Sequence, residues 1–107
     1  MYKRQKYYKL AAEQGVAKAQ CNLGVYYELG YGITKDYAEA HRWYMLAAEQ
    51  GDAEAQCNLG ILYEFERGVK QDYVEAIKWY KLAAEQGHEK AQYNLDYMKA
   101  NGQGTVH

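Results

Sequence analysis

Small and aromatic residues recur along this chain with the spacing of amphipathic helices. Ala19, Leu23 and Tyr27 stand four residues apart, which places them on one face of a helix predicted from Ala17 to Leu29. A second stripe at helical spacing predicts a helix from Asp36 to Gln50, and its members are Ala40, Trp43, Tyr44 and Ala47.

Both patterns return further along the chain and predict helices from Ala53 to Phe65 and from Asp72 to Gln86. Asp36 and Asp72 are suitable N-cap residues because each has a glutamate three positions later, as in a capping box. Glycines follow the predicted second helices, where a left-handed residue is favoured, at Gly15, Gly51 and Gly87.

The helix pairs belong to an exact 36-residue repeat. The motif Tyr-x-Leu-Ala-Ala-Glu-Gln-Gly occurs three times, ending at Gly15, Gly51 and Gly87. Residues 8–43 match residues 44–79 at 22 of 36 positions without a gap. A single helix pair cannot bury both of its faces, so such units stack and share a continuous core.

Two glycines interrupt the first helices, although glycine in a helix interior costs about 1 kcal/mol relative to alanine. We expect Gly24 and Gly60 to allow close approach of the paired helix beside the small Ala40 and Ala76. The tyrosine pairs Tyr27 with Tyr44 and Tyr63 with Tyr80 would fill the wider ends, and Trp43 and Trp79 would bridge to neighbouring units.

The run from Leu23 to Gly51 resembles the Sel-one-like repeats, which are relatives of the tetratricopeptide repeats. It reads Leu-Gly…Tyr…Gly-x-Gly-Ile…Asp…Ala-x-x-Trp-Tyr-x-x-Ala-Ala-Glu-x-Gly. The similarity extends over about residues 7–97, and one departure is Glu66 in the place of Gly30. The resemblance implies an α-solenoid whose members mostly act as protein-binding scaffolds.

The predicted fold class is therefore all-α, an α-solenoid of stacked antiparallel helix pairs with about six helices. We expect one array over residues 1–101 and a flexible tail at 102–107. The array divides into a half unit at 1–15, full units at 16–51 and 52–87, and a half unit at 88–101. The absence of proline and the 13 tyrosines agree with closely packed helices that have aromatic fillers.

The half units at the two ends carry charged residues where the full units have small or apolar ones. Arg4 stands in the place of Ala40, whereas Asp96 and Lys99 stand in the places of Gly24 and Tyr27. These replacements predict a self-contained array with polar caps. The alternative is that the two ends of the array are uncapped and associate in a homo-oligomer. Sedimentation at several protein concentrations would distinguish this oligomer from a capped, monomeric array.

By the same resemblance, the first helices line a concave face on which a ligand lies. This transfer predicts a peptide-binding groove formed by Cys21, Asn22, Val25, Glu28, Leu29, Cys57, Asn58, Ile61, Glu64, Phe65, Tyr93, Asn94 and Tyr97. Asn22, Asn58 and Asn94 form a ladder at one helix position, and an amide suits a peptide bond because it donates and accepts at once. A structural role between units is the other, favoured interpretation of this ladder.

The remaining chemistry of the sequence is sparse. Two cysteines separated by one repeat are too far apart for a disulfide, so Cys21 and Cys57 are expected as free thiols, which favours a cytoplasmic location. No catalytic, metal or cofactor motif is present, so no enzyme activity is expected. The net charge of −1 argues against a nucleic-acid partner, and no apolar run is long enough for a membrane span.

These observations favour a non-catalytic scaffold that holds a peptide or helical segment of a protein partner on the concave face. The alternative function is a structural module that assembles through homo-oligomerisation, with contacts at the chain ends.

Overall fold

The protein is a stack of six α-helices in the part of the chain that the structure describes. The structure is a computed structural model that describes residues 2–104, with side chains from residue 6 onward. The helices are α1 (Tyr2–Glu13), α2 (Ala17–Leu29), α3 (Tyr37–Glu49), α4 (Ala53–Glu64), α5 (Tyr73–Glu85) and α6 (Glu89–Ala100). The predicted all-α solenoid is confirmed. Each helix begins and ends within about two residues of the position expected from the sequence.

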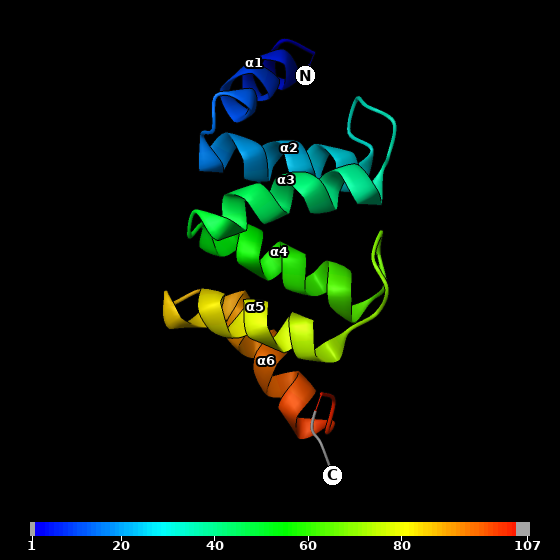
Figure 1. Cartoon of the computed structure of the whole chain (residues 1–107), viewed down its shortest axis with the longest axis vertical. Helices are drawn as coiled ribbons and strands as arrows, with labels where there is room; N and C mark the ends of the chain where they lie inside the picture. Colours follow the sequence, from blue (N-terminus) through cyan, green and yellow to red (C-terminus); the bar gives the residue numbers. More distant parts are fainter. Residues whose placement is uncertain (1, 105–107) are drawn as a thin grey trace.

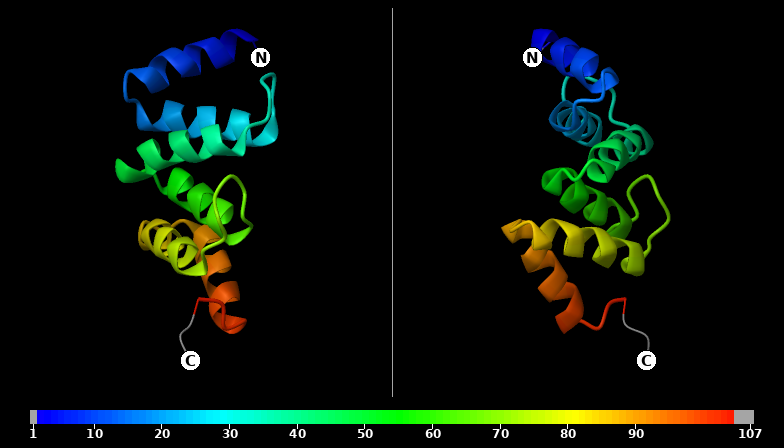
Figure 2. Two further views of the ribbon diagram at one scale, coloured as in Figure 1. Left: turned by 45° about the vertical axis from the view of Figure 1, so that its right-hand side comes forward. Right: turned by 60° about the vertical axis from the view of Figure 1, so that its left-hand side comes forward.

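Each helix packs mainly against the helices before and after it in the chain. The result is an elongated body of 49 × 26 × 18 Å, with the N-terminus at one end and the C-terminus at the other (Figure 1). The helix directions change steadily from α1 to α6, so that the stack twists about its long axis (Figure 2). Because contacts are made between neighbours, equivalent residues of successive units lie in rows along the stack.

The predicted helix ends are confirmed. The side chain of Asp36 accepts a hydrogen bond from the Glu39 backbone N–H at 3.1 Å, and Asp72 does the same for Glu75 at 3.0 Å. Asp52 caps α4 in the same way, by accepting from the Ala55 N–H at 2.9 Å. These caps satisfy backbone donors that a helix N-terminus leaves without partners.

The loop after α4 keeps the backbone shape of the loop after α2 despite the replacement of glycine. Gly30 has a φ of 68°, and Glu66 at the equivalent position has a φ of 55°. Glutamate in this left-handed region costs about 1–2 kcal/mol, because its Cβ crowds the neighbouring carbonyl oxygen. The repeat geometry therefore imposes a strained conformation on Glu66.

Relief of this strain should stabilise the protein. We expect Glu66→Gly to raise the free energy of unfolding by about 0.5–1 kcal/mol, since the gain is partly offset by greater freedom of the unfolded chain. The variant also loses an exposed hydrogen bond between Glu66 Oε1 and the Gln71 N–H. Urea denaturation followed by circular dichroism measures the change. Gly30→Glu is the matched reverse variant and should destabilise; a stabilised Gly30→Glu protein would contradict this account.

The core of each unit contains a tyrosine ring that lies directly on the mid-helix glycine. A Cβ atom added to Gly24 would be 2.5 Å from Tyr44 Cε1, and one added to Gly60 would be 2.6 Å from Tyr80 Cε1. The expected close approach is confirmed, but the group that approaches is the aromatic ring rather than the small Ala40 or Ala76. Tyr44 and Tyr80 are fully buried and fill the middle of each helix pair instead of its wider end.

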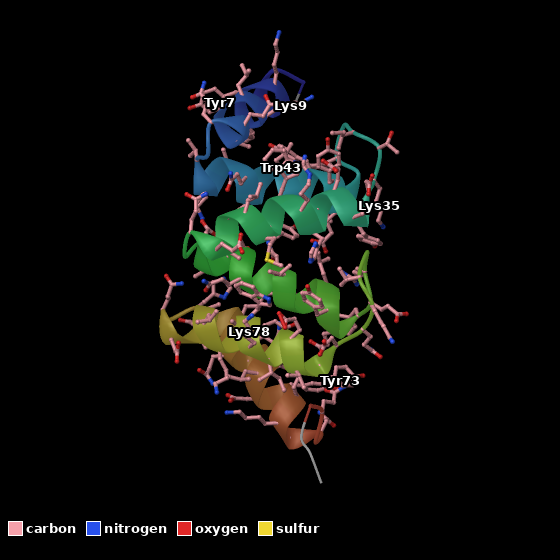
Figure 3. The ribbon with its side chains drawn as sticks, viewed as in Figure 1. Tyr7, Lys9, Lys35, Trp43, Tyr73 and Lys78 are labelled. Atoms are coloured by element: carbon pink, nitrogen blue, oxygen red, sulfur yellow. The ribbon has the colours of Figure 1, made fainter. Side chains whose placement is uncertain are left out.

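The two tryptophans join neighbouring units, as predicted. Trp43 of α3 shares a core cluster with Ala12 of α1 and with Ala19 and Leu23 of α2. In Figure 3, Trp43 rises from α3 towards α1. Trp79 of α5 belongs in the same way to the cluster of the preceding unit. The second helices therefore contribute to two cores, which makes the array continuous.

A ladder of buried glutamine amides also connects the helices. Gln20 Nε2 donates to the Ala12 carbonyl oxygen at 3.2 Å, and Gln20 Oε1 accepts from Gln50 Nε2 at 2.7 Å. One unit later, Gln56 donates to the Ala48 carbonyl at 3.2 Å and accepts from Gln86 at 3.0 Å. Each amide thus satisfies a carbonyl at the end of the preceding second helix, as buried polar groups require.

Two of the residues from which polar caps were predicted lie on α6. Asp96 and Lys99 are both exposed on α6. The side chain of Arg4 lies outside the described residues, and so do residues 105–107 of the predicted tail. Residues 102–104 form a turn, and Gly104 lies against Ile77, since an added Cβ would be 2.5 Å from Ile77 Cδ1.

Candidate functional site

The candidate groove residues lie on α2, on α4 with Phe65 directly after it, and on α6. Large apolar side chains are exposed along this surface: Leu29 is 62% exposed, Phe65 56% and Tyr97 55%. Val25 and Ile61, one turn before Leu29 and Phe65, are half-buried. We call this set, together with Tyr93, the first-helix surface. Leu29 and Phe65 occupy the same repeat position, so the surface repeats along the stack.

Three of the predicted groove residues lie in the core rather than on the surface. Cys21 and Cys57 are buried, and Glu64 is only 6% exposed. Burial, with a smaller contribution from the charge of Asp52, raises the pKa of the Cys21 thiol to about 12. Burial raises the pKa of Cys57 to about 11. Both thiols are free, as expected, and act as small core residues.

Glu28 and Glu64 hold the tyrosines that pack on the glycines. Tyr44 donates its hydroxyl to Glu28 Oε1 at 2.7 Å, and Tyr80 donates to Glu64 Oε1 at 2.7 Å. Glu28 also accepts from Arg67 of the next unit at 3.3 Å. Burial, followed by the hydrogen bond to glutamate, raises the pKa of both tyrosines far above the ordinary value. These glutamates are therefore structural, although Glu28 keeps an exposed part.

The asparagine ladder makes contacts between units. The Asn58 amide nitrogen lies 4.0 Å from Cys21 Sγ of the preceding unit. The Asn94 side chain lies near the Tyr80 hydroxyl and makes a small contribution that lowers the pKa of that phenol, against the larger raising effect of burial. Asn22, Asn58 and Asn94 nevertheless stay half-buried. The contacts agree with the structural interpretation, while the exposed part of each amide leaves room for a ligand.

One ion pair and one hydrogen bond connect the starts of successive first helices. Lys18 Nζ lies 3.3 Å from Asp52 Oδ2, and His88 Nε2 lies 2.9 Å from Glu54 Oε2. Partial burial acts to lower the pKa of Lys18, but the hydrogen bond and charge of Asp52 raise it overall. Side-chain contacts thus join the N-terminal turns of successive first helices.

The histidines have structural neighbours. His41 Nε2 is 3.1 Å from the Tyr63 hydroxyl, and burial lowers the pKa of His41. His88 Nδ1 caps α6 by accepting from the Ala91 N–H at 3.2 Å. Within the described residues, no three His, Cys, Asp or Glu side chains lie close enough together to hold a metal ion. None of the described helices has the length and apolar character needed to cross a membrane.

Two polar networks were not predicted from the sequence. They are the tyrosine–glutamate pairs that hold the rings over the glycines and the glutamine ladder between helices. A signal for both exists, because Glu28, Tyr44 and Gln20 all recur unchanged one period later. Polar residues that repeat at a fixed position in every unit indicate a shared structural task.

Stacked helix pairs with an aromatic core and a repeated apolar row define an α-solenoid. The Sel1 repeat matches four consecutive segments, at residues 5–16, 17–52, 53–88 and 89–106. The chain therefore belongs to the Sel1 repeat family. These segments divide the chain at nearly the same places as the half and full units predicted from the sequence.

Solved structures are similar over almost the whole chain. A protective antigen from uropathogenic Escherichia coli with an SLR fold is 44% identical over 94% of this chain, with a TM-score of 0.92. A Sel1 repeat protein from Oxalobacter formigenes is 42% identical over 97%, with a TM-score of 0.85. The chain spans only 22% and 45% of these two proteins.

A third structure is more distant. Cysteine rich protein B from Helicobacter pylori is 28% identical, with a TM-score of 0.82. The match covers 88% of this chain and 71% of that protein. The present chain shares its fold but has only two cysteines, both unpaired. No curated protein matches the chain closely enough to count as a relative.

Proposed function

We propose that the chain is a non-catalytic scaffold that binds a peptide or helical segment of a protein partner on the first-helix surface. Proteins of the Sel1 repeat family typically serve in protein–protein interaction. The observation that carries the proposal for this chain is the repeated exposure of large apolar side chains on successive first helices. Leu29 and Phe65 are more than half exposed at one repeat position, with Tyr97 on the same side of α6.

The composition of this surface suits a protein partner. Aromatic and aliphatic anchors supply most of the binding energy in protein interfaces, and polar groups at the rim orient the partner. The half-buried Asn22, Asn58 and Asn94 add donors and acceptors beside the anchors, which a peptide backbone can use. The free, buried thiols support a cytoplasmic setting for this interaction.

Substitution of exposed anchors tests the proposal. Affinity capture with the full chain and mass spectrometry identifies a partner, whose binding is then measured with purified components. Phe65→Asp and Tyr97→Ala should each weaken binding at least about tenfold, because each removes an exposed anchor without opening the core.

Val74→Asp is the matched control, since Val74 is 64% exposed on α5, away from this surface. It should leave binding unchanged. Binding that survives both anchor substitutions would refute the proposal, and loss of self-association in these variants would point to homo-oligomeric assembly instead.

A further inference from the structure

A second open site lies at the N-terminal end of the stack, away from the first-helix surface. A groove of about 490 Å³ lies between α1, α2 and the loop that follows α2. Its walls include Lys6, Lys9 and Leu10 from α1, Leu23 and Tyr26 from α2, and Ile33 from the loop. This volume falls within the range of ligand pockets in proteins. We call it the N-terminal groove.

The following unit shows one way in which the repeat closes this space. The positions of Lys9, Tyr26 and Ile33 are held one period later by Met45, Leu62 and Val69. Leu62 is fully buried there, and Met45 and Val69 pack against the same core cluster. The lysine returns in α5 as Lys81, but the tyrosine is particular to the first unit, because Leu62 and Met98 stand at the later equivalents of Tyr26. The combination of Lys9 with Tyr26 is therefore what sets the wall of the N-terminal groove apart from the closed unit that follows.

The charges around the groove determine which ligand it fits. Four of the 12 residues of α1 are basic and one, Glu13, is acidic, a net charge of +3 in a chain whose total is −1. Lys6 and Lys9 are exposed, and within the described part of the chain neither lies within 4.0 Å of a carboxylate. Figure 3 shows Lys9 on α1 at this end of the stack. The rim can thus pair with acidic groups that the chain does not supply.

We propose that the N-terminal groove binds a peptide segment in which an apolar pair of residues is flanked by acidic ones. The apolar pair packs on Leu10, Leu23, Tyr26 and Ile33, and the acidic flanks lie against Lys6 and Lys9. Glu13 also lines the groove and repels the acidic flank that reaches it, so the attraction comes from the part of the segment beside Lys6 and Lys9. This site is independent of the first-helix surface and gives the scaffold a second contact point.

The test uses a defined probe, a fluorescein-labelled peptide of sequence Glu-Asp-Glu-Leu-Phe-Glu-Asp-Glu. Its binding to the full chain is followed by fluorescence anisotropy at two salt concentrations. We expect saturable binding that weakens as salt increases, because exposed charges are screened within about 10 Å at 0.1 M salt. A peptide with lysines in place of the acids, and one with serines in place of Leu-Phe, should each bind at least about tenfold more weakly.

A variant that copies the closed unit supplies the decisive control. The double substitution Lys9→Met and Tyr26→Leu gives the groove the residues found one repeat later, removes the Lys9 charge and the Tyr26 wall, and should abolish probe binding. Circular dichroism and thermal unfolding confirm that this variant is folded. Phe65→Asp should leave probe binding unchanged, which separates this site from the first-helix surface.

Three results would overturn the proposal. They are the absence of saturable binding at millimolar peptide, equal binding of the lysine-containing peptide, and undiminished binding to the folded double variant. If the double variant fails to fold, Lys9→Met alone should still weaken binding of the acidic probe without changing that of the lysine peptide. Equal loss for both peptides would refute the role of charge.

Discussion

Gly60→Ala is expected to destabilise the protein by about 2–3 kcal/mol, although alanine is the better helix former by about 1 kcal/mol. The added methyl group would lie 2.6 Å from Tyr80 Cε1 and 2.7 Å from Cδ1, far inside normal contact distance. The ring cannot move away easily, because its hydroxyl is hydrogen-bonded to Glu64 at 2.7 Å. Chemical denaturation followed by circular dichroism at 222 nm measures the loss.

Asp96→Ala is the matched control for this substitution. Asp96 occupies the same repeat position on α6, is exposed, and its side chain accepts a hydrogen bond from Gln92 of the same helix. Since no tyrosine ring covers it, the change to alanine should alter stability by less than about 0.5 kcal/mol. A Gly60→Ala protein as stable as the wild type would show that ring packing does not require the glycine.

Tyr80→Phe is expected to cost about 2–3 kcal/mol, and clearly more than Tyr44→Phe. Among the described residues, Tyr80 is the only side-chain donor to the Glu64 carboxylate, so its removal leaves a buried charge without a partner. Glu28, the partner of Tyr44, keeps Arg67 at 3.3 Å, and Tyr44→Phe should cost about 1 kcal/mol. Urea denaturation at pH 7 compares the two variants.

A double variant checks the cause of this difference. When both partners of a buried hydrogen bond are replaced by apolar groups of similar shape, the loss of stability is much smaller than when one partner is removed and the other is left unpaired. Tyr80→Phe combined with Glu64→Met should therefore recover part of the stability lost in Tyr80→Phe alone. The double variant could instead be less stable than Tyr80→Phe, by as much as a second core substitution costs. In that case the unpaired Glu64 carboxylate is not the source of the stability lost in Tyr80→Phe.

The architecture could be predicted because the repeat displays each structural requirement more than once. A single Gly24 in a helix is ambiguous, but the pair Gly24 and Gly60 points to a constraint on packing. The identity of the packing group could not be predicted. Whether an alanine or the ring of Tyr44 lies over Gly24 depends on the crossing of two helices, and spacing along one helix does not determine that crossing.

The candidate surface was harder to predict for a related reason. Cys21, Cys57 and Tyr93 share one repeat position, yet the cysteines are buried and Tyr93 is 70% exposed. The next first helix covers the position in α2 and α4, and no described helix follows α6. The exposure of a residue therefore depends on its place in the array as well as on its place in the unit. Similarly, the N-terminal groove depends on Lys9 and Tyr26, which differ from their counterparts one repeat later.

The pairing of each helix mainly with its chain neighbours also bears on how such a molecule can change in length. A duplicated stretch of DNA that encodes 36 residues would insert a new layer whose upper and lower faces match the layers already there. No distant contact would have to be rebuilt, and the twist would simply continue through the added layer. Growth by whole layers preserves the fold while it moves the N-terminal groove and the α6 end of the first-helix surface farther apart, so that gene duplication alone could reset the distance between two bound partners.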